Sequence, residues 1–321
     1  CQGGRAADIS AAASSRVMGG ELRIPSGPLA SIGPLGAPDA EGIAVPEGFS
    51  VRAVARHGTP PALGGNYLWH AFPDGGACYP RDNGGWIYTS NSEVPGNRGG
   101  CGALVFDPDG TVVDAYSILG NTSSNCAGGQ TPWNTWLSCE ETGSGQTWET
   151  DPYGAVGAVA KPSLGLFAHE AAVVDIRNRT VYETEDTGDS RFYRWLADPA
   201  DYSAADQRLA LERGRLQVLN IEGYENDGYP DNAEDIRQLR RATWVDVVNP
   251  DQAQSEVRAS LAAAGETVPG TLFRGGEGLW FYELPEAARS VPPGGQYPTR
   301  GIVFFTTKGD NRVLAYDVEN E

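Results

Sequence analysis

The sequence predicts an all-β fold with few short helices. Short runs rich in β-branched and aromatic residues alternate apolar with polar side chains, and Gly, Pro, Asp or Asn bound each run. Glycine (42) and proline (22) together make up about a fifth of the 321 residues, which suits many tight turns. Strands of this kind are typical of a barrel, a sandwich or a propeller, and composition does not choose among these three.

The strand runs extend from near residue 48 almost to the end of the chain. They occupy residues 48–58, 84–93, 102–119, 135–141, 170–186, 191–197, 214–221, 278–284 and 301–318. After residue 40 no linker rich in Pro, Ser and Gly divides them, so we expect one domain over residues 41–321.

Two segments have a helical pattern instead. Residues 201–214 carry a weak apolar stripe, and residues 251–265 are rich in alanine and end at Gly265, a suitable C-terminal cap. We expect a short helix in each segment.

The net charge of the chain limits the kinds of molecule that it is expected to bind. Lys and Arg number 24 against 42 Asp and Glu, which gives a net charge of -18. This charge argues against nucleic acid, because a phosphate backbone requires a basic surface. It suits a protein that binds cations, and it equally suits a protein that simply stays soluble. We expect a monomer.

The start of the chain resembles a tether. Residues 1–40 have the composition of a flexible arm. The first residue, Cys1, leaves two interpretations open: a lipid anchor on a processed exported protein, or an arbitrary boundary. No apolar run reaches the roughly 18 residues of a membrane span. The tether, the high glycine content and the presence of only two lysines favour an exported protein, whether periplasmic, cell-surface or secreted.

Several familiar active sites are excluded. The chain has three histidines and no HExxH motif, so a histidine-rich zinc site is not expected. It has no phosphate-binding Walker loop and no GxSxG elbow of a serine hydrolase. Cys78 and Cys101 flank a strand-turn-strand stretch, and both a disulfide and two free thiols are compatible with that spacing.

Acids at strand ends remain as candidates for chemistry. They are Glu93, Glu140, Glu141, Glu170, Glu185, Asp186, Glu277 and Asp310. Hard cations such as calcium take carboxylate and carbonyl oxygens, and a thiolate beside them favours a transition metal such as iron.

Four ordered motifs resemble those of the PhoX family of alkaline phosphatases. They read "NCAGGQTPWNTWLSCEE", "HEAAVVD" with "VYETED", "FRGGEGLWFY" and "FFTTKGDNRVLAYD". The resemblance covers most of the chain, from about residue 45 onward. It implies a β-propeller, six-bladed when complete, that is exported and hydrolyses small phosphate esters. It also implies a cluster of ferric and calcium ions (Fe3+ and Ca2+) held by carboxylates and one cysteine.

The resemblance also assigns residues. Cys126 matches the cysteine that binds iron. Glu140 and Glu141 match a pair of acidic ligands, and the match of Glu141 is the firmer of the two. Glu170 and Glu277 match further acidic ligands. Glu93, Glu185, Asp186 and Asp310 are expected calcium ligands. Arg274 is expected to be catalytic and to bind the substrate phosphate, where a guanidinium can meet two oxygens. Lys308 is expected to contact phosphate.

Two other functions stay open at this point. One is a calcium-dependent propeller hydrolase of the lactonase type, and the other is a non-catalytic cell-surface propeller. Because the chain ends directly after a strand-like run, we also expect that further strands beyond residue 321 complete the ring.

Overall fold

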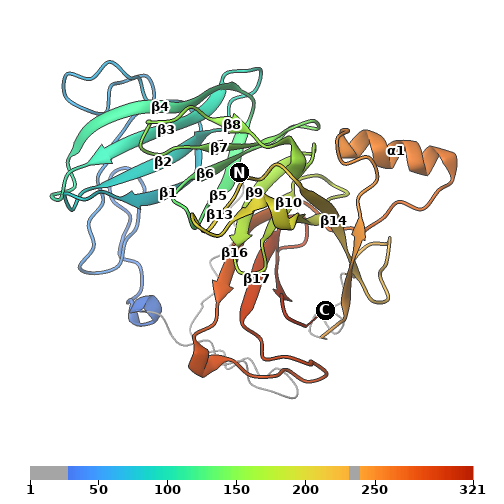
Figure 1. The fold of residues 1–321 in the computed structure, drawn as a ribbon. Helices are drawn as coiled ribbons and strands as arrows, with labels where there is room; N and C mark the ends of the chain where they lie inside the picture. The colour runs from blue at the N-terminus through green and yellow to red at the C-terminus, as the bar shows by residue number, and fades with distance from the viewer. Residues whose placement is uncertain (1–27, 231–238, 321) are drawn as a thin grey trace.

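The computed structural model describes residues 28–230 and 239–320, and most of the regular secondary structure in them is β-strand (Figure 1). The arm expected before residue 41 and the anchor at Cys1 lie largely or wholly outside them. Within the described residues, no helix is both long enough and apolar enough to cross a membrane.

Four antiparallel sheets account for most strands, and a two-stranded hairpin stands apart. The first sheet contains β1 (Pro73–Pro80), β2 (Trp86–Ser92), β3 (Gly99–Phe106) and β4 (Val112–Thr122). The second contains β5 (Asn125–Gln130), β6 (Trp136–Glu140), β7 (Thr147–Thr150) and β8 (Val159–Ala160). The third contains β9 (His169–Asp175), β10 (Thr180–Glu185), β11 (Phe192–Ala197), β14 (Gly214–Ile221) and β15 (Ala242–Asp246). The fourth contains β16 (Gly276–Glu283), β17 (Gly301–Thr307) and β18 (Arg312–Asp317).

The remaining elements are short. One α-helix, α1 (Gln254–Ala264), lies at the edge of the molecule in Figure 1, and the hairpin pairs β12 (Tyr202–Ser203) with β13 (Arg208–Leu209). Short 3-10 turns cover Pro28–Ser31, Pro162–Leu164, Pro199–Asp201 and Glu286–Ala288.

The four sheets are arranged like the blades of a propeller. Strands β1, β5, β9 and β16 each form one edge of their sheet, and they lie next to one another in that order. The all-β class with few short helices is therefore confirmed, and these first strands form the centre of a propeller-like arrangement. A closed ring of six blades stays a prediction.

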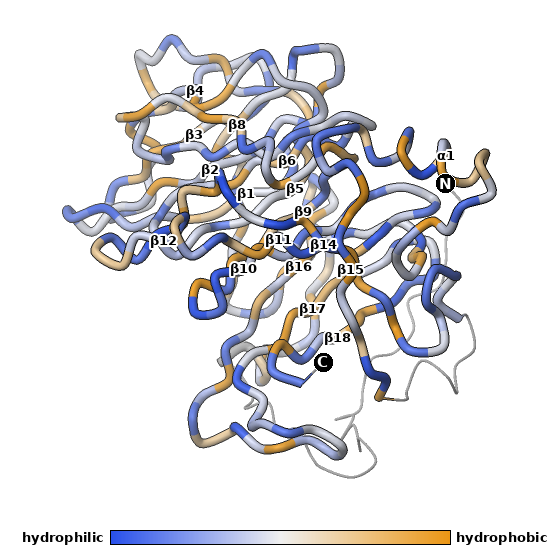
Figure 2. Tube along the Cα trace, turned by 45° about the vertical axis from the view of Figure 1, so that its right-hand side comes forward, coloured by the Kyte–Doolittle hydropathy of each residue, from blue (hydrophilic) through white to orange (hydrophobic). Residues whose placement is uncertain are grey.

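Apolar side chains fill the spaces between neighbouring sheets. Figure 2 shows hydrophobic segments along the strands and hydrophilic ones in many of the connecting loops. Between the third and fourth sheets, Phe192 stacks on Phe305 with ring centroids 4.2 Å apart, and Tyr182, Trp244 and Tyr316 surround the pair. Aromatic side chains bury large areas, so each such layer stabilises the position of one blade against the next.

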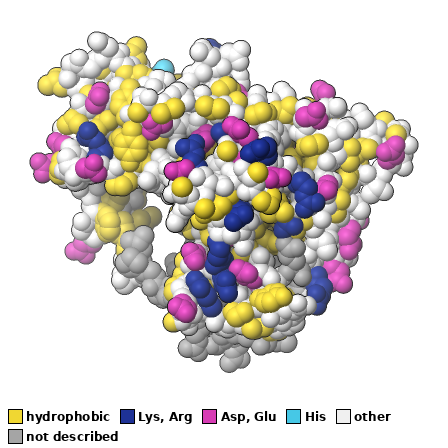
Figure 3. All heavy atoms as spheres, in the orientation of Figure 1, with side chains coloured by type: hydrophobic (Ala, Val, Ile, Leu, Met, Phe, Trp, Pro, Cys, Tyr) yellow, Lys and Arg dark blue, Asp and Glu magenta, His cyan; other side chains and the backbone are white. Residues whose placement is uncertain are grey.

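The surface in the view of Figure 3 carries acidic and basic side chains side by side. Apolar side chains appear between them.

One expected helix is confirmed and the other is wrong. Helix α1 ends at Gly265, whose left-handed φ of 71° is the conformation that makes glycine a good C-terminal cap. Residues 201–214 instead form the β12–β13 hairpin and a loop. The buried Asp201 carboxylate accepts the backbone N–H groups of Leu211, Glu212 and Arg213, which fixes the loop and leaves no helical ladder.

The cysteine alternatives are resolved for the described residues. Cys78 is exposed, Cys101 is buried, and both are free thiols, as are Cys126 and Cys139. Of the two alternatives left open for Cys78 and Cys101, the structure therefore has the two free thiols.

The aromatic layer between blades predicts a large effect of Phe192→Ala. Removing a buried phenylalanine leaves a cavity and costs about 3–5 kcal/mol in the free energy of unfolding. Phe49→Ala is the matched control, because Phe49 is 56% exposed. Urea unfolding measures both variants. Equal stability of the two would contradict the packing described here.

Candidate metal centre and phosphate site

The same irregularity occurs near the start of the first strand of each of the four larger sheets. At this point the pairing is interrupted by a β-bulge, in which two residues of the first strand lie opposite a single residue of the second strand. The two-residue bulges are Asp74–Gly75, Cys126–Ala127, Glu170–Ala171 and Glu277–Gly278, facing Asn91, Cys139, Thr184 and Thr306. A bulge re-aims a side chain out of the regular alternation, and bulges are frequent beside active sites.

Each bulge combines a ligand-type side chain with a small residue. The first residue is Asp, Cys, Glu or Glu, and the second is Gly, Ala, Ala or Gly. The small residue permits close approach of neighbouring blades: a Cβ on Gly75 would lie 2.7 Å from the Cα of Ala127. Four ligand-type side chains are thus brought to the centre at one end of the inner strands. We call Asp74, Cys126, Glu170 and Glu277 the inner ring.

A second set of polar side chains follows the second strand of each sheet. Immediately after β2, β6, β10 and β17 come Glu93, Glu141, Asp186 and Lys308. We call these four residues the outer ring. Three are acids and the fourth is one of the chain's two lysines.

The donor atoms of the two rings converge. The Cys126 Sγ–H donates to Oε1 of Glu170 at 3.4 Å. Donor atoms of Cys126, Glu141 and Glu170 lie within 4.8 Å of one another, and so do those of Asp74, Glu93 and Cys126. Cys126 therefore belongs to both groups, and its thiol stands where the inner and outer rings meet.

Lys308 connects the acids of the third and fourth sheets. Its ammonium pairs with Asp186, and it lies 2.9 Å from Oε1 of Glu277. The hydrogen bond from Lys308 to Asp186, followed in importance by that to Glu277, raises the pKa of the lysine despite partial burial. Asp186 in turn lies close enough to Glu141 to help raise its pKa.

Arg274 lies next to this cluster. It comes three residues before Glu277, and its carbonyl accepts the N–H of Gly309 at 2.9 Å. A Cβ on Gly309 would lie 2.7 Å from the Cβ of Arg274, so the turn after Lys308 packs directly on the arginine. The Arg274 side chain is exposed at the same end of the sheet as Glu277 and Lys308.

Two acids of the cluster, Glu170 and Glu141, have raised pKa values. Burial, reinforced by the charges of Glu277 and Glu141, raises the pKa of Glu170 to about 8. Burial and the neighbouring Asp186 raise the pKa of Glu141 to about 7. Burial and the charge of Glu170 also raise the pKa of the Cys126 thiol well above its ordinary range. Cations bound among these groups would replace the protons and remove the repulsion.

The donor set fits metal ions. Three ligand-type atoms from three strands converge within 4.8 Å, and they include one soft sulfur among hard carboxylate oxygens.

Three of the expected ligands are not brought into the cluster. Glu140 precedes Glu141 in the chain, and its carboxylate accepts the N–H groups of Ser123, Gln146 and Trp148. Asp310 accepts from the Thr307 hydroxyl and pairs with Arg312 at 3.3 Å.

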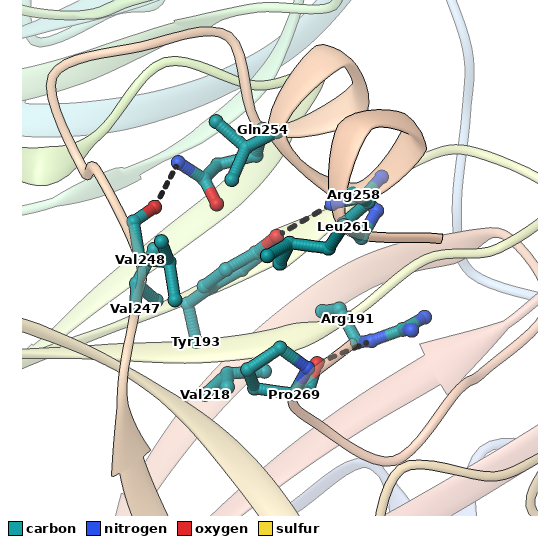
Figure 4. Close-up of a pocket in the computed structure, with 10 residues that line it drawn as sticks. Arg191, Tyr193, Val218, Val247, Val248, Gln254, Arg258, Leu261 and Pro269 are labelled. Atoms are coloured by element: carbon teal, nitrogen blue, oxygen red, sulfur yellow. Dashed lines mark hydrogen bonds between the residues drawn. The ribbon is translucent and has the colours of Figure 1, made fainter. Parts of the chain in front are cut away.

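Glu185 has become half of a buried ion pair. Its two oxygens accept from the Arg258 guanidinium at 2.9 and 3.2 Å. Arg258 also donates to the Tyr193 hydroxyl beneath α1, as Figure 4 shows. Side chains alternate along a strand, so Asp186 faces the centre while Glu185 faces α1.

Sequence reasoning missed Asp74. It is exposed, and the motif around it, "FPDGGACYP", contains no second acid. A usable signal was present: an Asp, Cys or Glu followed by Gly or Ala occurs once near the start of each sheet's first strand.

A family model described as alkaline phosphatase PhoX matches residues 103–157 and 145–319, more than half of the chain. The chain belongs to the PhoX alkaline phosphatase family. Members of this family are metal-dependent phosphatases that hydrolyse phosphoric esters, and the family is exported. Comparison with curated proteins found no match.

A solved structure agrees with the PhoX fold. The chain is similar to Pseudomonas fluorescens PhoX in complex with vanadate, a transition state analogue, with 15% identity and a TM-score of 0.58 over 88% of this chain and 74% of that chain. This likeness confirms the propeller-like fold. A putative 6-phosphogluconolactonase from Bacteroides uniformis also matches, with 11% identity over 85% of this chain and 74% of that chain. Its TM-score of 0.31 is too low to indicate a shared fold.

The buried pair predicts separate roles for neighbouring acids. Glu185→Gln leaves the buried Arg258 guanidinium with the half-exposed Asp189 as its carboxylate partner, and should cost about 1–3 kcal/mol in the free energy of unfolding. It should not change the metal content of the protein, because its oxygens already serve Arg258. Asp186→Asn should lower the metal content with a smaller loss of stability. Elemental analysis and thermal melting compare the two variants, and a loss of metal in Glu185→Gln would contradict this assignment.

Proposed function

We propose that this PhoX chain hydrolyses small phosphate monoesters at the cluster formed by the inner and outer rings, with iron and calcium as its metals. The observation that supports the proposal is the convergence of the Cys126 thiol with carboxylates from several sheets. A protein that used calcium for stability alone would not need a soft ligand at the meeting point of the two rings.

The donors divide between the two metals by chemistry. Cys126 and its hydrogen-bond partner Glu170 would hold iron together with Glu277, because a thiolate with carboxylates suits a transition metal. Glu141, Asp186 and Glu93, joined by Asp74, would hold calcium through oxygen alone. When bound, the metals would neutralise charge on the phosphate and would lower the pKa of water toward moderate pH.

Arg274 would bind and orient the phosphoryl group. A guanidinium presents paired N–H donors that match two phosphate oxygens, and it keeps its charge at every working pH. Its exposed position beside the Lys308–Gly309 turn places it at the rim of the cluster. Fixed charges aimed at the oxygens on which charge develops are usually the largest catalytic contribution.

Lys308 would have two tasks. In the metal-free protein, its ammonium pairs with the carboxylates of Asp186 and Glu277 and so keeps these two acids close together. Because its side chain is 59% exposed, it can also reach a substrate phosphate from the rim. Arg274 and Lys308 thus offer the positive charges needed for an anionic substrate in a chain of net charge -18.

We further propose that residues 41–321 form one propeller domain, and that the protein works as a monomer in the periplasm, at the cell surface or as a secreted protein. Family membership supports export.

Iron content tests the role of the thiol. Cys126→Ser should lose most of its iron while the fold remains, because serine keeps the size of the residue and removes the soft ligand. Cys78→Ser is the matched control, since Cys78 is an exposed free thiol. Elemental analysis after purification without chelator gives the answer. Full iron content in Cys126→Ser would exclude the proposed ligand.

Turnover tests the role of the arginine. Arg274→Ala should keep its metals and lose roughly 100-fold or more in kcat with p-nitrophenyl phosphate, as expected when a charge that stabilises the transition state is removed. Arg215→Ala, a change at a 63% exposed arginine, should behave like the unchanged protein. An unaltered kcat in Arg274→Ala would refute the assignment, and inactivity of the metal-loaded unchanged protein would refute the phosphatase proposal itself.

A further inference from the structure

Thr184 is the residue of β10 that faces the Glu170–Ala171 bulge, and its hydroxyl contacts two bulges at once. The Oγ1 accepts the N–H of Ala171 at 3.2 Å, on the residue that follows Glu170. The same hydroxyl donates to the carbonyl of Glu277 at 2.7 Å, on the first strand of the next sheet. Thr184 is 1% exposed, so neither bond is shared with bulk solvent.

We propose that Thr184 is a positioning residue that sets the separation of Glu170 and Glu277, and that it thereby controls metal affinity. This inference rests on the proposed function, in which both glutamates hold metal. Thr184 does not touch the metal site with its own side chain: it fixes the backbone from which the two ligands project.

Repulsion between two carboxylates tends to separate the backbones that the Thr184 hydroxyl connects. Glu170 and Glu277 are carboxylates on the adjacent strands β9 and β16, and like charges on neighbouring strands repel each other when no cation lies between them. A bulge has lost part of its regular ladder of hydrogen bonds, so its backbone is easier to displace than the rest of the strand. A hydroxyl that both accepts from one bulge and donates to the other holds the two backbones at one distance.

The neighbouring pair of sheets shows the same arrangement. Asn91 is the residue that faces the first bulge, and it reaches across to the second. Its side-chain N–H groups donate to the carbonyls of Cys126 and Ala127 at 3.0 and 2.7 Å. Its Oδ1 accepts from Trp136 and Ser138, so the amide itself is held in place. In both cases, the residue opposite one bulge anchors the bulge of the following blade.

An isosteric pair of variants separates positioning from packing. Thr184→Val keeps the shape and removes the hydroxyl, and Thr184→Ser restores the hydroxyl. The control is Thr150→Val, which removes a buried threonine hydroxyl that donates to the Trp136 carbonyl at 3.2 Å within the second sheet.

Two readouts are needed. Titration of metal-free protein with calcium chloride, and separately with a ferric salt, measures affinity. Hydrogen exchange of the Ala171 amide in metal-free protein reports the contact directly. Thr184→Val should weaken metal affinity by about 10- to 100-fold, the usual effect of losing a group that orients ligands. It should also speed exchange at Ala171, and Thr184→Ser should reverse both changes.

The outcomes are distinguishable. Weaker binding in Thr184→Val with unchanged affinity in Thr150→Val supports the proposal, even if both variants melt at the same lower temperature. Equal affinity of Thr184→Val and the unchanged protein for both ions overturns the positioning role alone. If the unchanged protein binds neither ion, the proposed function fails and the positioning role fails with it.

Discussion

The structure depends on a repeated departure from regular β-pairing. Each of the four sheets places a bulge near the beginning of its innermost strand, and each bulge presents one ligand-type side chain to the centre. A flat antiparallel ladder would send alternate side chains to opposite faces and would not gather them at one point. The bulge is therefore the constraint that turns four separate sheets into a single site, and the small residue behind each ligand allows the blades to meet there.

Bringing the carboxylates of the two rings together creates electrostatic repulsion, which other groups of the site must offset. Burial, reinforced by neighbouring carboxylates, raises the pKa of Glu170 to about 8 and that of Glu141 to about 7. The chain offsets part of the repulsion with Lys308, which replaces an acid at the fourth position of the outer ring. Metal ions would offset the rest. Stability and chemistry then rest on the same ions, since a ligand that binds only the folded state also stabilises it.

Much of the fold could be predicted from the sequence, because period-two alternation is a strong local signal. The sequence pattern predicts a helix at residues 201–214 in place of the hairpin. The apolar stripe there includes Leu209 and Leu211, which are both buried in the core although the segment is not helical. Cys126, Glu141, Glu170 and Glu277 could be proposed from their motifs, and the structure brings them together. Asp74 was missed because a bulge opposite Asn91, and not any feature of the motif, brings it to the centre. Glu140 and Glu185 were included because sequence cannot tell which of two adjacent acids faces inward.

Iron is expected to bind to the thiol of Cys126 together with the carboxylates of Glu170 and Glu277. Anomalous diffraction from crystals of the metal-loaded protein, recorded on both sides of the iron absorption edge, tests this most directly. We predict an iron peak in contact with Cys126 Sγ and with the carboxylates of Glu170 and Glu277, next to calcium sites formed by Asp74 and the acids of the outer ring. An iron peak elsewhere in the molecule, or metal-loaded crystals with a metal at this position that does not contact Cys126, would contradict it.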